Sequence, residues 1–420
     1  MTNDESPNDQ LAKQLLKRAH HRSDFVIRHS SAAPKPSEGG SLSLALIATD
    51  ALLTELLQKI DVADRVAIDT EADSLHSYRE KLCLLQMSVP TLFGIVDAGP
   101  DLGIATGNRD HRSRLQHDAI VDPLAGLDLE PLRQALETRE IVLHGADYDL
   151  RMLRLGLNFT ACTIFDTQIA ARLLGIREFS LAALVKRYFG LELPKGSQKA
   201  NWAKRPLPVR MAEYAINDVH YLLALAEKLE AELDACQRRD WLRQSCRRAI
   251  EQAAVARARK QDEFWRVRGS GSIHGRPAAV LRALWQWRER EAEMADRPPF
   301  HILQNEKLLN AALSVASGSM PDYKHFSHRR RETFREAARL GLAVPESDWP
   351  VLHRRFGTRP TAEMVRRTEE LRQRRDKSAE ELGLEPSFIA PRGSLEAIAA
   401  DRARAESLLV PWQRELLGIA

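Results

Sequence analysis

The pattern of apolar residues changes at about Cys236, and this change constrains the fold more than any other feature of the chain. Between residues 45 and 230, short β-branched runs such as Val66–Ile68 alternate with amphipathic stretches such as Leu52–Ile60. Strands interleaved with helices are typical of one α/β domain. After Cys236, nearly every segment has helical periodicity. We therefore expect an α/β domain followed by all-helical domains.

The α/β part predicts a succession of strands and helices. The expected strands are Val66–Asp69, Leu82–Val89, Thr91–Val96 and Ile141–His144, and the expected helices are Leu52–Ile60, Leu129–Leu136, Tyr148–Leu155, Thr167–Leu174, Leu181–Tyr188 and Val209–Leu233. Segment 99–118 is rich in Gly, Asp, Arg and His, so we expect a surface excursion there. The expected boundaries are a flexible segment at 1–40, the α/β domain at 41–236, a helical connector and linker at 237–275, and helical domains at 276–356 and 357–420.

The two helical domains repeat one another. When Leu284 is set against Leu371, about thirty residues align without a gap at an offset of 87 residues, and Pro299 falls on Pro386. The alignment preserves a helix, a proline-bearing loop and a second helix. Residues 357–420 are therefore expected to be a divergent copy of the preceding domain.

Composition excludes several classes of protein. A chain of 420 residues, 44% hydrophobic and 29% charged, is long enough for more than one globular core. No apolar run approaches the roughly 18 residues of a membrane span, and the acidic N-terminus lacks the apolar stretch of a signal peptide. The four cysteines have no C-x-x-C spacing, which disfavours a zinc site or a disulfide framework. A cytoplasmic protein without membrane association is expected.

Charge is distributed unevenly along the chain. Residues 1–236 contain 27 of the 62 Lys and Arg residues and 33 of the 58 Asp and Glu residues, so the front part carries about −6 and the rear part about +10. Clustered cations favour a polyanionic partner, because they release counterions from a phosphate backbone. Solvated helix faces would also account for these charges, and on charge alone this explanation is preferred.

Acidic residues occur at the ends of two predicted strands. Asp69 and Glu71 are two residues apart, so strand periodicity turns both to one face. Two carboxylates in that position suit a hard cation such as Mg²⁺, although a D-x-E motif often occurs by chance. After the strand Ile141–His144, Asp147 has the position of a helix N-cap and Asp149 lies in the first helical turn.

A third motif lies on a late helix. Tyr214 and Asp218 are four residues apart and hence neighbours on one helical face, where a buried Tyr bonded to an Asp is the usual meaning. Asp166 and Thr167 are expected to cap the helix that follows them. Each motif is weak alone, but the combination in this order is more specific.

The order of the motifs resembles the ribonuclease D family, in the tyrosine-bearing branch of the DEDD superfamily of 3′-to-5′ exonucleases. The resemblance is carried by VAIDTE, CLLQMSV, IVLHGADYDLRML, FDTQIAARLL, EYAINDVHYLLAL and the run from Lys195 to Leu207. The segment LRALWQWREREAEMADRPPFHILQNEKLL resembles an HRDC domain, and residues 365–420 look like a second, divergent copy. The resemblance implies a ribonuclease H-like (DnaQ-like) α/β domain, with a mixed sheet flanked by helices, followed by HRDC-type helical domains.

The resemblance also implies a mechanism. Two divalent ions, Mg²⁺ or Mn²⁺, would be bound by Asp69, Glu71, Asp149 and Asp218, and Tyr214 would orient or help to deprotonate the attacking water. The implied activity is metal-dependent removal of nucleotides from RNA 3′ ends, with release of nucleoside 5′-monophosphates. The implied substrates are tRNA precursors and other structured RNA with a free 3′ end, and no obligate protein partner is evident.

Weaker expectations concern contacts with the substrate. The candidates are Gln86, His144, Lys195, Trp202 and Arg205. A Trp offers a stacking surface and the cations offer charge to phosphates. A strand Gln and a strand-end His are more often structural, and packing of the Trp against the domain is about as probable as substrate contact.

Alternatives remain at this stage. A 3′-to-5′ DNA exonuclease would carry the same acids, and a non-catalytic RNA-binding scaffold could keep the fold. In the helical domains, Trp285 and Trp287 have the spacing of core residues, so the run His328–Arg331 is the expected RNA contact, with a solvated face as the alternative.

Overall fold

The structure is a computed structural model that describes residues 45–90, 116–194, 196, 199–255, 264–351 and 360–419. Four expected features lie outside these residues: the segment 1–40, the strand Thr91–Val96, most of the excursion 99–118, and Lys195. None of the helices in the described ranges is both long and apolar enough to cross a bilayer.

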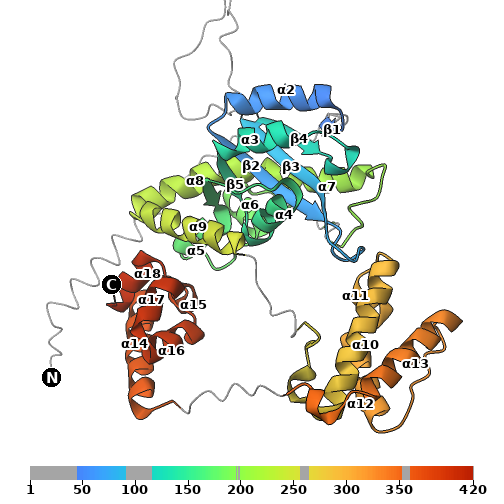
Figure 1. Ribbon diagram of the computed structural model, residues 1–420. Coiled ribbons are helices and arrows are strands. Elements are labelled where there is room, and N and C mark those ends of the chain that lie inside the picture. The colour runs from blue at the N-terminus through green and yellow to red at the C-terminus, as the bar shows by residue number, and fades with distance from the viewer. Residues whose placement is uncertain are drawn as a thin grey trace, which may run out of the picture. The chain divides into compact units, whose positions relative to one another are not determined.

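A six-stranded mixed sheet forms the centre of the α/β domain (Figure 1). Its strands, in the spatial order β1-β4-β3-β2-β5-β6, are β1 (Ala45–Ile47), β2 (Arg65–Ala72), β3 (Leu82–Pro90), β4 (Gln116–Val121), β5 (Glu140–Leu143) and β6 (Thr163–Asp166). β3 runs antiparallel to β2 and β4, whereas the pairs β1–β4, β2–β5 and β5–β6 are parallel. The expected mixed sheet is confirmed. β1, β4 and β6 escaped sequence prediction because they are short or begin with polar residues.

Helices pack around this sheet (Figure 1). They are α2 (Asp50–Asp61), α3 (Glu130–Glu137), α4 (Asp147–Leu157), α5 (Thr167–Leu173), α6 (Leu181–Phe189), α7 (Val209–His220), α8 (Leu222–Ala235) and α9 (Arg239–Ala254). α9 lies in the expected connector, yet it packs against α4 and β6 and buries Leu242, Cys246 and Ala253 in the main apolar core. The core of the domain therefore extends beyond residue 236.

The expected helix Val209–Leu233 is divided into α7 and α8 at Tyr221. α7 packs on β2, β3 and β4, whereas α8 packs mainly on α5 and β5. His220, the last residue of α7, is held by Asp118 of β4, with 2.5 Å between Nδ1 and Oδ2. The chain turns at this point because the two helices follow different parts of the sheet.

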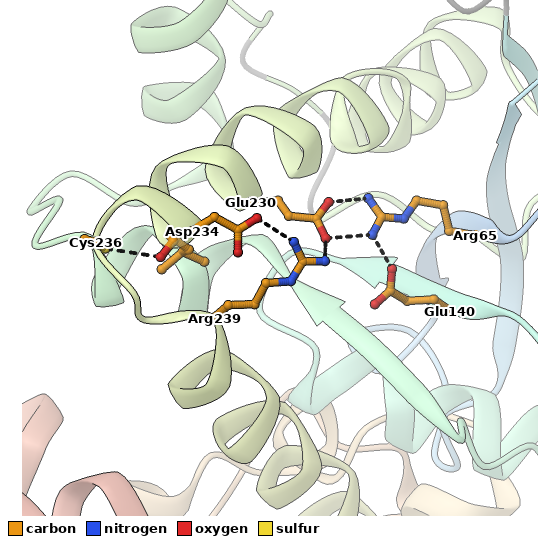
Figure 2. A network of polar contacts seen from close by, with 7 residues as sticks. Arg65, Glu140, Glu230, Asp234, Cys236 and Arg239 are labelled. Carbon is orange, nitrogen blue, oxygen red and sulfur yellow. Dashed lines mark hydrogen bonds and ion pairs between the residues drawn. The ribbon is translucent and has the colours of Figure 1, made fainter.

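An ion-pair network anchors the first residue of β2 (Figure 2). Arg65 contacts Glu140 at the start of β5 at 2.5 Å and Glu230 of α8 at 3.1 Å. Arg239 of α9 pairs with the same Glu230 and, at 2.9 Å, with Asp234. The Arg65 and Glu230 side chains are 17% and 16% exposed, so each charge depends on its partners for compensation. The network joins two parallel strands to two helices.

Two groups of helices follow, drawn in orange and red in Figure 1. The first contains α10 (Gly275–Met294), α11 (Pro299–Ile302), α12 (Asn305–Ala316) and α13 (His328–Leu342), and the second contains α14 (Ala362–Leu382), α15 (Pro386–Ile389), α16 (Arg392–Ala400), α17 (Ala405–Leu408) and α18 (Pro411–Leu417). Short 3₁₀ helices occupy Pro123–Ala125, Ser270–Ser272, Glu346–Asp348 and Arg402–Arg404. Leu284 and Trp287 lie in the apolar cluster of the first group, and Leu371 and Leu417 lie in that of the second.

The offset of 87 residues recurs in the structure. α10, α11 and α12 begin 87 residues before α14, α15 and α16, respectively. A contact between an arginine and a backbone carbonyl repeats at the same offset: Arg288 Nη1 donates to the carbonyl of Leu303 at 3.2 Å, and Arg375 Nη1 donates to that of Ala390 at 3.1 Å. In each group, this bond ties the long first helix to the chain just after the short second helix.

Candidate active site

Asp69 and Glu71 lie on the face of β2 that α7 covers. Glu71 pairs with Leu84 of β3, and Leu84 belongs to an apolar cluster shared with α7. Asp218 of α7 joins the two acids: one oxygen from each of the three carboxylates lies within 4.8 Å of the others. All three side chains are partly buried. The structure thus brings together the D-x-E motif and the motif on the late helix.

Tyr214 is held in place by several contacts. It lies one turn before Asp218 on α7, and its hydroxyl donates a hydrogen bond to the Asp218 carboxylate. The backbone of Gly196 approaches the ring so closely that a Cβ there would lie 1.8 Å from Tyr214 Cδ2. The ring of Trp202 lies at a centroid distance of 6.1 Å. Packing and hydrogen bonding together fix the orientation of the phenol.

Asp149 enters the site from α4 and is only 5% exposed. Its Oδ1 accepts hydrogen bonds from the Thr70 hydroxyl at 2.6 Å and from the Thr70 backbone N–H at 3.1 Å. β5 pairs with β2 from Arg65 to Ala67, so it does not reach Thr70. Asp149 takes over as the hydrogen-bond partner of β2 at this point. It is not one of the three residues whose oxygens converge within 4.8 Å.

Burial raises the pKa of all four carboxyl groups, and repulsion from the neighbouring acids of the site raises the pKa of Asp69 and Glu71 further. Burial is the larger cause for Asp69, whose pKa lies well above its usual value, and the three other acids add repulsion. Burial, followed by repulsion from Asp218 and Asp149, raises the pKa of Glu71 to about 8. Burial raises the pKa of Asp149 to about 7 and that of Asp218 to about 6, against the hydrogen bonds that each accepts. The four groups therefore resist joint ionisation unless a cation compensates them.

The donor set fits a hard divalent cation. The converging ligand atoms are all carboxylate oxygens, contributed by Asp69, Glu71 and Asp218. Mg²⁺ and Mn²⁺ prefer carboxylate and water oxygens, whereas softer metals select thiolate or imidazole. Asp149 keeps one oxygen, Oδ2, outside its bonds to Thr70. The site therefore suits the cations that the sequence predicted.

Asp166 anchors the start of α4. Its carboxylate accepts hydrogen bonds from the backbone N–H groups of Gly145 at 3.0 Å and Ala146 at 2.8 Å, just before the helix. It also caps α5 as expected, by accepting from Gln168 N–H at 2.8 Å. One buried carboxylate thereby sets the direction in which α4 leaves β5 and delivers its acid.

Asp147 and His144 lie at the junction between β5 and α4, and both had an expected role. The expected N-cap role of Asp147 is wrong: α4 begins at Asp147, and its exposed carboxylate pairs with Arg151 at 3.0 Å. The reason is that helical hydrogen bonding begins one residue earlier, where the N–H of Leu150 donates to the carbonyl of Ala146, so Ala146 is the N-cap residue. His144 is partly buried, and its Nδ1 lies 2.9 Å from Thr167 Oγ1.

Three of the expected substrate-contacting residues are engaged within the protein. Gln86 is 0% exposed and lies opposite Asp69 in the β2–β3 pairing. Trp202 is 1% exposed and packs in the apolar cluster of β3 and α7. Arg205 donates to both carboxylate oxygens of Asp122, each at 2.6 Å. Contact of Gln86 or Trp202 with a substrate would require these enclosed side chains to leave their present positions, whereas the Arg205 side chain is 28% exposed and is held by its ion pair.

Two residues that shape the site had no expected role. Thr70 lies between the two acids of the D-x-E motif, where a hydroxyl carries no distinctive signal. Asp73 is 1% exposed, accepts hydrogen bonds from the Ser77 hydroxyl and from Lys81 N–H, and pairs with Lys81 Nζ at 3.1 Å. It organises the turn that follows Glu71. The spacing of Asp73 and Ser77 is the signal that could have revealed it.

In the first helical group, two arginines of the run His328–Arg331 bind a buried carboxylate. Glu291 is 3% exposed and accepts from Arg329 Nη2 at 2.7 Å and from Arg330 Nε at 3.1 Å. Burial opposes ionisation of Glu291, but the two arginines outweigh it and lower its pKa. Trp287 is 2% exposed, in agreement with its expected core position. Two of the arginines expected to contact RNA therefore form ion pairs within this helical group.

Comparison with known proteins defines the class. Residues 44–234 match the 3′-5′ exonuclease family, and residues 278–315 match the HRDC domain. The chain therefore combines a 3′-5′ exonuclease domain with an HRDC domain. The expected fold class is confirmed, and the acidic cluster meets the requirement of this class for divalent metal.

Several relatives carry the name ribonuclease D. The ribonuclease D of Sphingobium indicum is 34% identical over 276 residues, covering 64% of this chain and 63% of that protein. The ribonuclease D of Gluconacetobacter diazotrophicus is 27% identical over 396 residues, covering 91% and 93%. The structure of Escherichia coli RNase D superposes with a TM-score of 0.63 at 21% identity, covering 90% and 97%.

Over these spans the chain is similar to ribonuclease D. The matches with the Sphingobium indicum and Zymomonas mobilis proteins span 63% of the length of each relative.

Proposed function

We propose that this protein is a metal-dependent 3′-5′ exoribonuclease that removes nucleotides from RNA 3′ ends and releases nucleoside 5′-monophosphates. The observation that carries the proposal is the convergence of Asp69, Glu71 and Asp218 from β2 and α7, with Asp149 of α4 bound to Thr70 between the two acids of β2. Raised pKa values make such a cluster dependent on cations at neutral pH, and cations held by carboxylates support hydrolysis of phosphodiesters.

The geometry suggests a role for each residue. Asp69, Glu71 and Asp218 would bind cations directly, since their oxygens converge, and Asp149 would act through water, since one of its oxygens is bound within the protein. When bound, two divalent ions, Mg²⁺ or Mn²⁺, would activate a water and neutralise the attacking and leaving oxygens. Tyr214 would orient that water through its hydroxyl, which also bonds to the Asp218 carboxylate.

The proposed substrate is RNA with a free 3′ end, such as a tRNA precursor. The Escherichia coli relative is described as an exoribonuclease involved in structured RNA processing. The positive net charge of residues 237–420 would hold the RNA backbone while the acidic site acts on its end. His144 and Lys195 remain the proposed RNA contacts. We propose that Gln86, Trp202 and Arg205 support the site from within, because they are buried or ion-paired.

The domain boundaries belong to the same proposal. Residues 357–420 would form a second, divergent HRDC-like domain, supported by the arginine–carbonyl contact that Arg288 and Arg375 make at the same offset. The cytoplasmic location expected from the sequence stays a prediction.

The test is digestion of 5′-labelled RNA, and of single-stranded DNA of the same sequence, with Mg²⁺, Mn²⁺ or EDTA. Stepwise shortening of the RNA is expected, and EDTA and Asp69→Asn should abolish it. Asp147→Asn is the matched control, because the Asp147 carboxylate is exposed and pairs with Arg151.

Three outcomes would contradict the proposal. Full activity of Asp69→Asn would refute the assigned site. Preferential shortening of the DNA would favour a DNA exonuclease. RNA binding without cleavage by the wild-type protein would favour a scaffold.

A further inference from the structure

Four unpartnered polar atoms lie on the sheet beneath α7. Within the described part of the chain, Gln86 Nε2 and Oε1, Ser88 Oγ and Asp118 Oδ1 are buried without a hydrogen-bond partner. Gln86 and Ser88 are both 0% exposed. Such atoms are rare in folded proteins, because nothing compensates the loss of their hydration. Their clustering therefore requires an explanation.

The strand register places these atoms in a stepped row on one face of the sheet, across two successive cross-strand pairs. Gln86 of β3 lies opposite Asp69 of β2, and Ser88 lies opposite Asp118 of β4. Opposite residues share a face of the sheet, with Cβ atoms about 4.5–5.5 Å apart. Gln86 and Ser88 share that face because they are two residues apart. The row runs from the proposed cation ligand to Asp118, which binds His220 at the end of α7.

The donors and acceptors of the row can be satisfied by a buried water. The Gln86 amide offers two N–H donors and one carbonyl, Ser88 offers a hydroxyl, and Asp118 offers one free oxygen. A buried water typically makes about three hydrogen bonds to groups that would otherwise be unsatisfied. A water shared by these three residues leaves one Gln86 N–H available to the carboxylate opposite it.

We propose that Gln86 is a positioning residue for Asp69. Together with a water shared with Ser88 and Asp118, its amide holds the Asp69 carboxylate in the orientation that binds the cation. Gln86 acts from behind the ligand and does not touch RNA, because its side chain has no exposed surface. The inference rests on the proposed function, which makes Asp69 a cation ligand.

The test is calorimetric titration of Mn²⁺ into the metal-free full chain. Gln86→Leu removes both amide atoms at similar volume. Its affinity for Mn²⁺ should fall about 10- to 100-fold, as is typical when the partner of a metal ligand is lost. Its Tm in EDTA is recorded separately, because the variant also removes a hydrogen-bond partner of the shared water and the cost to folding must be kept apart from the loss of affinity. Ser88→Ala should show a smaller loss of affinity in the same direction.

The matched control is Met87→Leu. Met87 is equally buried, but it points to the opposite face of β3, into the main core, so the variant should keep the wild-type affinity for Mn²⁺. This control separates a disturbance of β3 from the loss of the amide.

Wild-type Mn²⁺ affinity in Gln86→Leu would overturn the inference. A lower Tm in EDTA with unchanged affinity would overturn it as well, since that pattern marks a structural role. If Gln86→Leu does not fold, wild-type affinity in Ser88→Ala is the deciding negative result. Failure of the wild-type protein to bind Mn²⁺ would refute the proposed metal-dependent function itself, so the two failures are distinguishable.

Discussion

Binding of a divalent cation should release protons from the acidic site. By mass action at pH 7, a carboxyl group with a pKa of about 8 is ~90% protonated, one with a pKa of about 7 is half protonated, and one with a pKa of about 6 is ~10% protonated. These are the pKa values of Glu71, Asp149 and Asp218 in the metal-free protein. The three groups hold about 1.5 protons, and Asp69, whose pKa is also raised, adds to that number.

The perturbation that tests this reasoning is Glu71→Gln. A cation requires ionised carboxylates, so its binding displaces the protons that they carry. Glu71 contributes the largest share of the three with known values, about 0.9 proton, and the variant should lose that share. Titration of Mn²⁺ in two pH 7 buffers of different ionisation enthalpy measures the number released. Glu80→Gln, at an exposed position in the β2–β3 loop, is the matched control.

Two results would refute the reasoning. Release of fewer than about 0.5 proton by the wild-type protein would show that burial and repulsion do not keep the site protonated. Equal release by Glu71→Gln would show that the protons come from elsewhere.

The same shifts predict how the stability of the metal-free protein depends on pH. A carboxyl group with a raised folded-state pKa stabilises the protein below its unfolded pKa of about 4, and this stabilisation is lost as the pH rises through the folded value. With folded pKa values of about 6 to 8, the Tm in EDTA should fall between pH 6 and pH 8. Mg²⁺ should restore the Tm at pH 8, as a differential scanning calorimeter can record.

Further predictions concern single side chains. Asp149→Asn should lower the single-turnover rate on labelled RNA at least about 100-fold, whereas Asp147→Asn should stay within about 2-fold, because only Asp149 enters the site. Glu291→Ala should lower the free energy of unfolding by about 2–4 kcal/mol in urea titrations, since it leaves two arginines without their buried partner, while the exposed Glu332→Ala should change it by under about 0.5 kcal/mol. The lowered pKa of Glu291 means that its stabilisation is lost as the pH falls below about 4.5. Arg65→Met should cost about 1–3 kcal/mol in the same titrations, and an unchanged midpoint would show that the network in Figure 2 contributes nothing.

The meeting of the D-x-E motif with the Tyr214–Asp218 pair could be predicted from sequence through the resemblance of the motif order to a known family, since strand and helix periodicity alone only orient each pair. The geometry of Asp149 could not be predicted in the same way. Its bond to Thr70 depends on where β5 stops pairing with β2, and the length of strand pairing is set by tertiary packing.

The burial of individual side chains could not be predicted from the sequence either. Gln86 and Trp202 have side chains that serve substrate contact or packing equally well, and only the position of α7 over β3 decides that both are enclosed. The sequence predicts a solvated or RNA-binding run at Arg329 and Arg330. It does not reveal their partner Glu291, because Glu291 lies on another helix. A run of basic residues therefore predicts an exposed surface only where no buried acidic residue lies close enough to pair with it.

The parting of β2 and β5 after Ala67 limits how such a site could be transferred to another scaffold. β2 can offer a backbone N–H to Asp149 only because its parallel neighbour has ended on that side. Four acids copied onto a fully paired sheet would keep their identities but lose the gap into which α4 reaches. A transferred site would therefore need the point where β2 and β5 separate as well as the four acids.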